Sequence, residues 1–254
     1  MKFKNKVAVI TGAGSGIGKE TALLLAREGA EIILVGRTLS KLEKAAKEIN
    51  GVCDNNTAVT YTTDVTKEEE VKDLSSFLKN KYGNIDILIN NAGSSGSASI
   101  LELDVEDWEA IQNVNVTSVF LVSKHLSKLM IDAPKKKDRA IVNIASLSGH
   151  KAGAKIPHYS TAKAGVIHFS KALAAELAPY GIRVNSVSPG FTETPLTEQG
   201  LRNDSFVKAI ERHTALRRVG TPTEIANVIA FAASSEASYM TGTDLLVDGG
   251  WLIT

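Results

Sequence analysis

Short apolar segments alternate with amphipathic segments along almost the whole chain, and this alternation most strongly constrains the fold. The apolar segments are rich in β-branched residues and cover residues 7–11, 31–35, 59–63, 85–90, 140–145, 182–187 and 244–247. Helical periodicity fills the intervals, at residues 17–28, 40–50, 67–82, 105–130, 159–178 and 223–234. Apolar strands joined by helical crossovers form parallel sheets that are covered on both faces. The sequence therefore predicts one doubly wound α/β domain, residues 1–254, with a seven-stranded parallel sheet.

Only the segment 191–215 departs from this rhythm. It follows the sixth predicted strand and mixes charged with apolar residues. Ligands of open α/β sheets bind beyond the carboxyl ends of the strands, and the loops there often close over the site. We expect this segment to be a mobile substrate lid.

The composition argues against several classes of function. A net charge of +1 gives no electrostatic footprint for nucleic acid, and three lysines at 135–137 are expected to form a solvated loop. No apolar stretch reaches the roughly 18 residues of a membrane span. Cys53 is the single cysteine, so no internal disulfide is possible, and we expect a cytoplasmic protein. His158, His168 and His213 lack metal-ligand spacing, so no metal is expected.

A glycine-rich turn follows the first predicted strand, and an amphipathic helix comes directly after it. The turn reads TGAGSGIG over residues 11–18. Glycine lets the backbone approach a pyrophosphate, whose charge then faces the free N–H groups of the helix. The alternative is a plain tight turn, but the strand and helix on either side favour dinucleotide binding. The expected binding residues are Gly12, Ser15, Gly16, Ile17 and Gly18, and the turn lacks the lysine of an ATP-binding loop.

The end of the second predicted strand indicates which dinucleotide is bound. A carboxylate there bonds the ribose 2′-hydroxyl of NAD, whereas arginine accommodates the 2′-phosphate of NADP. The chain has Gly36 and Arg37 at this position and no carboxylate. NADP is therefore favoured and NAD stays possible, although a solvated loop arginine would look the same.

Tyr159 and Lys163 are four residues apart in a predicted helix and so share one face. An isolated phenol titrates near pH ~10, and a neighbouring cation favours the phenolate. The pair could therefore act as an acid/base catalyst at neutral pH. Taken alone, the pair does not establish catalysis, because tyrosine and lysine at this spacing are common on solvated helix surfaces.

These motifs and those downstream resemble the short-chain dehydrogenase/reductase superfamily, a group of Rossmann-type enzymes, nearly from end to end. Ser146 precedes Tyr159 by thirteen residues, which is the spacing of the family. The other matching segments are 11–18, 64–65, 90–93, 113–116, 180–185, 189–190 and 247–250.

The resemblance implies a catalytic tetrad of Asn115, Ser146, Tyr159 and Lys163. Tyr159 would exchange a proton with a carbonyl or alcohol oxygen as nicotinamide exchanges hydride with the carbon. Lys163 would bind the nicotinamide ribose and lower the Tyr159 pKa, Ser146 would bind the carbonyl oxygen, and Asn115 would support a water relay. Each also has an ordinary structural interpretation, such as a strand end or a solvated lysine.

Further cofactor contacts are implied at the other strand ends. Asp64 would bond the adenine amino group with Val65 beside the ring, although Asp64 could simply cap the next helix. Ser15 does not support NADP, because many NADP-dependent relatives carry a basic residue in this part of the glycine turn. The remaining expected contacts, after the fourth and sixth strands, are Asn91, Ala92, Gly93, Pro189, Gly190, Thr192 and Thr194.

The substrate is less strongly indicated. The pattern looks most like 3-oxoacyl-[acyl-carrier-protein] reductases, with sugar or polyol dehydrogenases as the alternative. An acyl-carrier-protein thioester is thus a possible partner, and basic residues near the lid could meet it: Arg202, Lys208, Arg212, Arg217 and Arg218. Substrate choice should depend on residues 94–99, 148–156 and 191–215.

Two other classes of function share some of these features. A binding protein that senses NAD(P) without turnover would keep the dinucleotide fold, but the intact tetrad argues against it. A sugar-nucleotide epimerase uses the same Tyr/Lys pair, but usually needs a longer carboxyl-terminal substrate domain.

The carboxyl terminus, residues 249–254, is apolar, and a monomer would be unlikely to expose it. We expect it, together with the helices at 105–130 and 159–178, to lie at subunit interfaces. The family resemblance implies a homotetramer.

Overall fold

The computed structural model describes residues 1–53, 57–132 and 138–254, so the lysines at 135–137 lie outside the described residues. A parallel seven-stranded sheet has the strand order β3-β2-β1-β4-β5-β6-β7, which confirms the predicted fold class. The strands are β1 Val7–Thr11, β2 Glu31–Gly36, β3 Ala58–Thr62, β4 Ile87–Asn90, β5 Arg139–Ile144, β6 Ile182–Pro189 and β7 Asp244–Val247.

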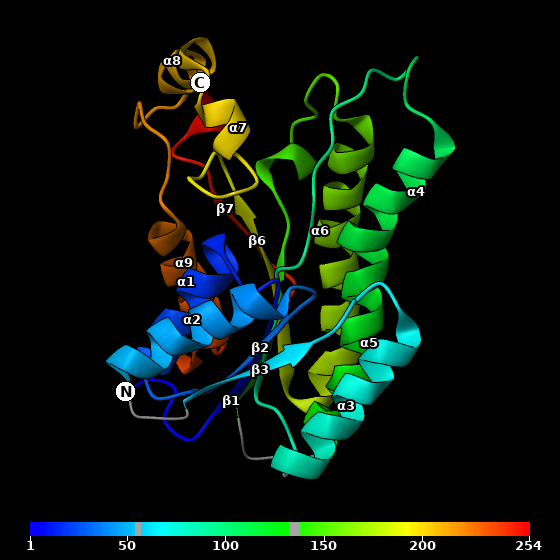
Figure 1. Ribbon diagram of the computed structural model, residues 1–254, viewed down its shortest axis with the longest axis vertical. Helices are drawn as coiled ribbons and strands as arrows, with labels where there is room; N and C mark the ends of the chain where they lie inside the picture. The colour runs from blue at the N-terminus through cyan, green and yellow to red at the C-terminus, as the bar shows by residue number, and fades with distance from the viewer. Residues whose placement is uncertain (54–56, 133–137) are drawn as a thin grey trace.

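Helices cover both faces of the sheet (Figure 1). One face carries α1 Gly16–Arg27, α2 Leu39–Val52 and α9 Pro222–Ala233. The other carries α3 Glu68–Tyr82, α5 Ser118–Ile131 and α6 Pro157–Leu177, with α4 Val105–Gln112 beside α6. Two hydrophobic cores follow, one on each side, because alternate residues of a strand point to opposite faces.

Burial explains why the strands are mostly apolar. Every residue of β4, β5 and β6 is buried, whereas the edge strands β3 and β7 are mostly half-buried. A central strand with helices on both faces has no solvated side on which polar residues could alternate. Polar residues within these strands, such as Asn143 and Ser186, must therefore find partners inside the protein.

The chain changes direction across the sheet at β1. This strand pairs with β2 on one side and with β4 on the other. The chain therefore adds β2 and β3 on one side of β1 and then crosses back to add β4 to β7 on the other side. The loops at such a point diverge and leave a crevice at the carboxyl ends of the strands. The glycine turn lies at this position, at the end of β1.

The structure differs from the sequence-based expectations in two segments. The predicted helix over 105–130 is interrupted at Asn113–Thr117 by a π-helical turn between α4 and α5. The irregular segment 191–215 contains two short helices, α7 Glu198–Leu201 and α8 Asp204–His213. Short 3₁₀ turns lie at Leu147–Gly149, Ala178–Tyr180, Ser235–Ala237 and Trp251–Ile253. Within the described residues, no helix is both long and apolar enough to span a membrane.

Candidate active site

Close backbone packing shapes the glycine turn. Gly12 has a φ of +65° and lies so near β4 that a Cβ would come within 2.9 Å of Ala92 Cα. Asn91 Nδ2 donates hydrogen bonds to the carbonyls of Thr11 and Gly12 at 3.0 and 3.2 Å. A Cβ on Gly18 would approach Asn91 Nδ2 to 2.4 Å, so this glycine allows helix packing. Gly18 is buried and, unlike the other predicted residues of the turn, does not line the adjoining cavity.

A first cavity, of about 420 Å³, extends from this turn to the ends of β2 and β3. Arg37, Asp64 and Val65 line it as predicted, and Lys41 of α2 adds a second cation. The sequence analysis missed Lys41, although its position four residues after Arg37 in a predicted helix places it near the same strand end. The cavity thus presents two cations beside Gly36, where a carboxylate would favour NAD.

Asp64 lines the first cavity, and its side chain closes the turn before α3 instead of capping that helix, whose N-cap is Lys67. Its Oδ1 accepts hydrogen bonds from Thr66 N at 3.1 Å and from Thr66 Oγ1 at 2.7 Å, just before α3 begins. Burial alone would raise the pKa of Asp64, but these hydrogen bonds and the nearby charges of Arg37 and Lys67 bring it below its ordinary value. The carboxylate is therefore ionised at neutral pH.

A second cavity, of about 700 Å³, lies beyond the ends of β5 and β6. It shares Ile17, Asn91, Gly93, Thr194 and Leu196 with the first cavity, so the two form one continuous cleft. Its lining includes the whole predicted tetrad. The cleft is long enough to connect the glycine turn with the Tyr/Lys pair, as a dinucleotide requires.

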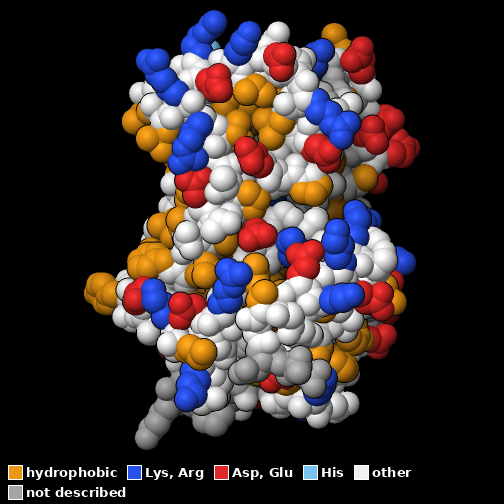
Figure 2. All heavy atoms as spheres, turned by 60° about the vertical axis from the view of Figure 1, so that its left-hand side comes forward, with side chains coloured by type: hydrophobic (Ala, Val, Ile, Leu, Met, Phe, Trp, Pro, Cys, Tyr) orange, Lys and Arg blue, Asp and Glu red, His pale blue; other side chains and the backbone are white. Residues whose placement is uncertain are grey.

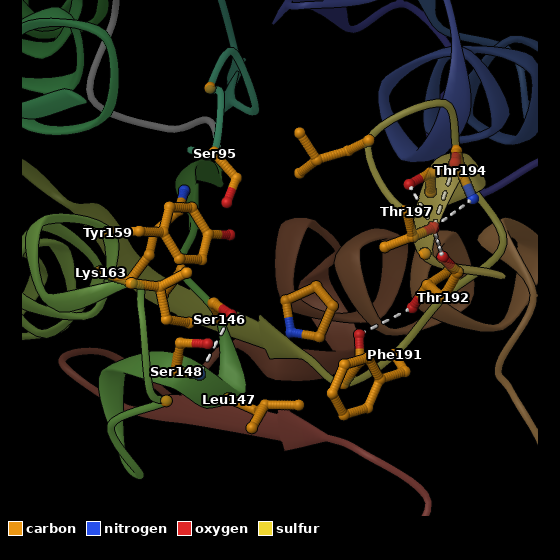
Figure 3. A pocket seen from close by; sticks show the side chains of 18 of the residues that line it. Ser95, Ser146, Leu147, Ser148, Tyr159, Lys163, Phe191, Thr192, Thr194 and Thr197 are labelled. Atoms are coloured by element: carbon orange, nitrogen blue, oxygen red, sulfur yellow. Dashed lines mark hydrogen bonds between the residues drawn. The ribbon is translucent and has the colours of Figure 1, made fainter. Parts of the chain in front are cut away.

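Ser146, Tyr159 and Lys163 converge on one side of this cavity (Figure 3). Ser146 follows β5 and accepts a hydrogen bond from Ser148 N at 3.1 Å, which starts the Leu147–Gly149 turn. Tyr159 and Lys163 lie one turn apart on α6, and Lys163 Nζ is 5.7 Å from the Tyr159 ring centroid. Lys163 is only 5% exposed and donates a hydrogen bond to Ile144 O at 2.8 Å.

The π-helical turn positions Asn115 behind Lys163. Its Nδ2 donates to Ile111 O at 3.0 Å and to Ser94 O at 2.9 Å. Its Oδ1 is buried without a partner in the described structure, and a Cβ on Gly93 would come within 2.8 Å of it. Extra helical residues of this kind are frequent at functional sites. Asn115 therefore keeps a free acceptor beside Gly93 and Lys163.

The ionisation of the Tyr/Lys pair differs from the expectation. Burial raises the pKa of Tyr159, although the interaction with the Ser146 hydroxyl acts in the opposite direction. Burial also lowers the pKa of Lys163 to about 8. The net shift of the Tyr159 pKa in the ligand-free protein is therefore opposite to the expected lowering, because burial is its largest cause. At neutral pH the phenol is protonated and the lysine mostly charged.

The opposite wall of the second cavity comes from the segment after β6. Pro189, Gly190, Thr192 and Thr194 line it as predicted, but the Thr192 hydroxyl donates to Gly190 O and so also stabilises the loop. Sequence analysis placed two aromatic residues of this wall in the expected lid but missed the third, Trp251. The Phe191 ring packs edge-on against Phe206 at 5.5 Å and against Trp251 at 4.8 Å between centroids. Part of the apolar carboxyl terminus is thereby covered within its own chain.

These features fit a nicotinamide dinucleotide. The glycine turn offers backbone to a pyrophosphate, Gly93 leaves room that a Cβ would fill, and Asn115 Oδ1 remains unpartnered behind it. A metal ion has no comparable site, because the described residues contain no group of three or more His, Cys, Asp or Glu side chains that could hold one.

Comparisons with known proteins agree with this geometry. The family model described as Enoyl-(Acyl carrier protein) reductase matches residues 12–252. The 3-oxoacyl-[acyl-carrier-protein] reductase FabG of Thermotoga maritima is 41% identical over 100% of both chains. FabG of Vibrio cholerae is 38% identical over 98% of each chain. A short-chain type dehydrogenase/reductase from Mycobacterium marinum has a solved structure with 37% identity and a TM-score of 0.93, covering 100% of this chain and 98% of its own.

The full-length matches and the complete Ser/Tyr/Lys arrangement lead to the same assignment that the motif spacing predicts. The chain belongs to the short-chain dehydrogenase/reductase family of NAD(P)-dependent oxidoreductases.

Proposed function

We propose that the protein is an NADPH-dependent reductase of 3-oxoacyl thioesters, with an acyl-carrier-protein thioester as its substrate. The observation that carries this proposal is the convergence of Ser146, Tyr159 and Lys163 on one cavity with an aromatic opposite wall. Relatives named 3-oxoacyl-[acyl-carrier-protein] reductase that are 38–41% identical over nearly the whole chain support it.

The roles of the residues follow from their positions. Ser146 and Tyr159 direct their hydroxyls toward one substrate oxygen, which both hold by hydrogen bonds. Tyr159 donates its proton to that oxygen, and its raised pKa keeps the proton available at neutral pH. NADPH supplies the hydride when bound. Lys163 contacts the nicotinamide ribose, and Asn115 holds a water beside Lys163 through its free Oδ1.

The pyrophosphate and the two ends of the coenzyme have separate binding groups. Gly12, Ser15, Gly16 and Ile17 bind the phosphates, while Gly18 acts indirectly by allowing α1 to pack. At the adenosine end Asp64 and Val65 hold the base. The other contacts line the middle and nicotinamide end: Asn91, Ala92, Gly93, Pro189, Gly190, Thr192 and Thr194.

The preference for NADPH rests on the Arg37 and Lys41 cations. Replacing both with Gln should raise KM for NADPH about 10- to 100-fold and change KM for NADH less than about threefold, because only the 2′-phosphate loses charge-assisted hydrogen bonds. Steady-state kinetics with both coenzymes measure this. Lys47→Gln, on an exposed position of α2, is the matched control. A wild-type preference of about twofold or less in kcat/KM would contradict the assignment.

A carrier protein is supported by charge near the cavity entrance. Lys and Arg side chains gather around α8 at the top of Figure 2, with some Asp and Glu among them. Arg202 pairs with Glu198 and Arg218 with Glu224, whereas Lys208, Arg212 and Arg217 have no ion pair among the described residues. An acidic carrier would meet these free charges as the segment 191–215 closes as a lid.

Substrate profiling tests the proposal. The expected result is that NADPH oxidation with an acetoacetyl thioester has a higher kcat/KM than with sugars, cyclic ketones or a crotonyl thioester. Preference for the crotonyl thioester would identify an enoyl reductase instead, and preference for sugars a polyol dehydrogenase. Tight NADPH binding without turnover on any of them would favour the nucleotide-sensing alternative.

We also propose a homotetramer in the cytoplasm. Phe120 and Leu246 are 43% and 40% exposed on α5 and β7, and Ile253 is 83% exposed at the carboxyl terminus, so each would gain from a subunit interface. Cys53 as the single cysteine is consistent with a reducing compartment. Light scattering should give a mass about four times 27.1 kDa, and a particle of one chain would contradict the proposal.

A further inference from the structure

A buried carboxylate behind the active site connects three segments of the chain. Asp244, at the start of β7, has a side chain that is 8% exposed. Its Oδ1 accepts hydrogen bonds from the hydroxyls of Ser186 at 2.5 Å and Ser188 at 3.0 Å, both on β6. Its Oδ2 lies 2.8 Å from Nε2 of His150. Sequence analysis gave Asp244, Ser186 and Ser188 no role, and included His150 only in the segment 148–156 that was expected to affect substrate choice.

The sheet register brings the strand residues together. Ser186 pairs directly with Asp244 across the β6–β7 ladder, and Ser188 is two residues further along β6 on the same face. This face is the one that α6 covers. His150 reaches it from the turn after β5, so the edge strand is tied to a loop as well as to its neighbouring strand.

The cluster contains serine, histidine and aspartate, but its geometry does not suit nucleophilic catalysis. Nε2 of His150 makes both the contact with Asp244 and a 3.3 Å contact with Ser188 Oγ. A catalytic triad uses one imidazole nitrogen for the carboxylate and the other for the nucleophile. With Nε2 serving both, the ring cannot pass a proton between them. The cluster is therefore a hydrogen-bonded anchor.

The anchored segment carries Ser146. Residues 146–150, here called the Ser146 turn, are closed by hydrogen bonds from Gly149 N to Ser146 O at 2.9 Å and from His150 N to Leu147 O at 3.0 Å. At its beginning, Ala145 N donates to Val187 O of β6. At its end, His150 is tied to Asp244.

The Ser146 turn is also pressed against the catalytic helix. A Cβ on Gly149 would come within 2.9 Å of the Lys163 carbonyl carbon and 3.0 Å of Ala164 N, so the backbone of the turn touches α6 beside the Tyr/Lys pair. The contact with α6 fixes how closely the turn can approach, and the bond to Asp244 resists its movement away from β7. A shift of Ser146 would alter its distance from Tyr159 directly.

We propose that His150 and Asp244 are positioning residues that hold the Ser146 turn, and with it the Ser146 hydroxyl, at the correct distance from Tyr159. This inference rests on the proposed carbonyl reduction, since that reaction needs both hydroxyls on one oxygen. Neither His150 nor Asp244 is among the residues that line the two cavities. Their effect should appear in the chemical step, while coenzyme binding stays unchanged.

The test compares two substitutions of one residue. His150→Leu removes the donor, whereas His150→Gln keeps an amide N–H at a similar reach. We expect His150→Leu to lower kcat for the acetoacetyl thioester about 10- to 100-fold and His150→Gln to lower it less than about threefold, since small displacements of catalytic groups have effects of this size. The Kd for NADPH, from fluorescence titration, should stay within about twofold in both. Asp244→Ala should lower kcat at least as much as His150→Leu, because it also removes the bonds to Ser186 and Ser188, and the double variant should lose no more than Asp244→Ala, because the His150–Asp244 bond is then already broken.

His168→Leu, at an exposed position of α6, is the control for the same His-to-Leu substitution and should keep wild-type kcat. Amide hydrogen exchange of peptides from the Ser146 turn gives a readout without turnover: exchange should accelerate in His150→Leu and not in His150→Gln. Equal kcat for His150→Leu and wild type, or equal exchange, would overturn the inference. If the wild type reduces no carbonyl, both the proposed function and the inference fail. If the wild type is active and His150→Leu has the same kcat, only the inference fails.

Discussion

Replacing Tyr159 with Phe is expected to lower kcat for carbonyl reduction about 10²- to 10⁴-fold, which corresponds to ~3 to 5 kcal/mol of transition-state stabilisation. The substitution keeps the aromatic ring and its packing on α6 but removes the proton that neutralises the developing oxyanion. Ser146 would remain as a hydrogen-bond donor, so some activity should persist. Single-turnover measurement of NADPH oxidation isolates this step from product release.

The binding of NADPH to Tyr159→Phe should stay close to that of the wild type, because the lost hydroxyl faces the substrate. Tyr180→Phe removes a hydroxyl from a half-exposed tyrosine just beyond α6 and is the matched control, with unchanged kcat expected. Near-normal turnover of Tyr159→Phe would disprove the mechanism. A loss in both variants would instead point to an effect on folding.

Replacing Lys163 with Met should change activity and stability in opposite directions. Activity should fall about 10²-fold or more, because the variant lacks the cation and the ribose contact in the middle of the cleft. The activity of the wild type should show the same dependence on the lysine charge when the pH is varied. Its kcat/KM for reduction should decline as pH rises through about 8, where Lys163 loses its charge in the free enzyme.

The stability effect follows from burial of the lysine. The folded pKa of about 8 lies below the ordinary value of 10.5, so between these values the unfolded chain binds a proton that the folded chain has released. In this window the free energy of unfolding rises with pH, by about 3 kcal/mol in total, and below it the wild type carries the full cost of a buried cation. Met has no such cost, but its substitution leaves Ile144 O without a donor, at about 1 kcal/mol. Lys163→Met should therefore be more stable near neutral pH by about 2 kcal/mol.

Urea denaturation of variant and wild type at pH 7 and near pH 10 measures this difference. The advantage of Lys163→Met should disappear at the higher pH, since the wild-type lysine is then neutral in the folded chain. Lys171→Met, at an exposed position of the same helix, should show no pH-dependent difference from wild type. A variant that is less stable than wild type at both pH values would show that Lys163 is not held at an energetic cost.

Periodicity was sufficient for the architecture, because the central strands are buried on both faces and the helices that cover the sheet each have one apolar side. The prediction was least accurate where local geometry depends on side-chain hydrogen bonds. The π-helical turn at Asn113–Thr117 joins α4 to α5, and neither its backbone bond from Ser118 N to Asn113 O nor the bonds of Asn115 to Ile111 O and Ser94 O can be inferred from apolar spacing. Helix α7 has only four residues and is too short to show a periodicity, whereas the ten residues of α8 are strongly amphipathic and the sequence analysis missed them.

The residues of the candidate site also divide into those that the sequence predicted and those that it did not. Motifs next to strand ends could be assigned from spacing, since the topology brings all those ends to one edge. Residues brought to or behind the site by tertiary packing could not: Trp251 comes from the terminus and Asp244 from the last strand. Lys41 was overlooked, although its spacing from Arg37 places it near the same strand end. The sign of the Tyr159 pKa shift was wrong because sequence spacing reveals the neighbouring lysine but not the extent of burial.

The residues proposed to face the substrate line the second cavity from three segments outside the paired strands, at 94–99, 148–156 and 191–206. The groups proposed to move the proton lie instead on α6 and just after β5, within the layers of the fold. Evolution can therefore exchange these segments for new ones and obtain an enzyme for another alcohol, with the same chemistry and little penalty to folding. The same separation makes the three segments the natural targets for anyone redesigning this scaffold.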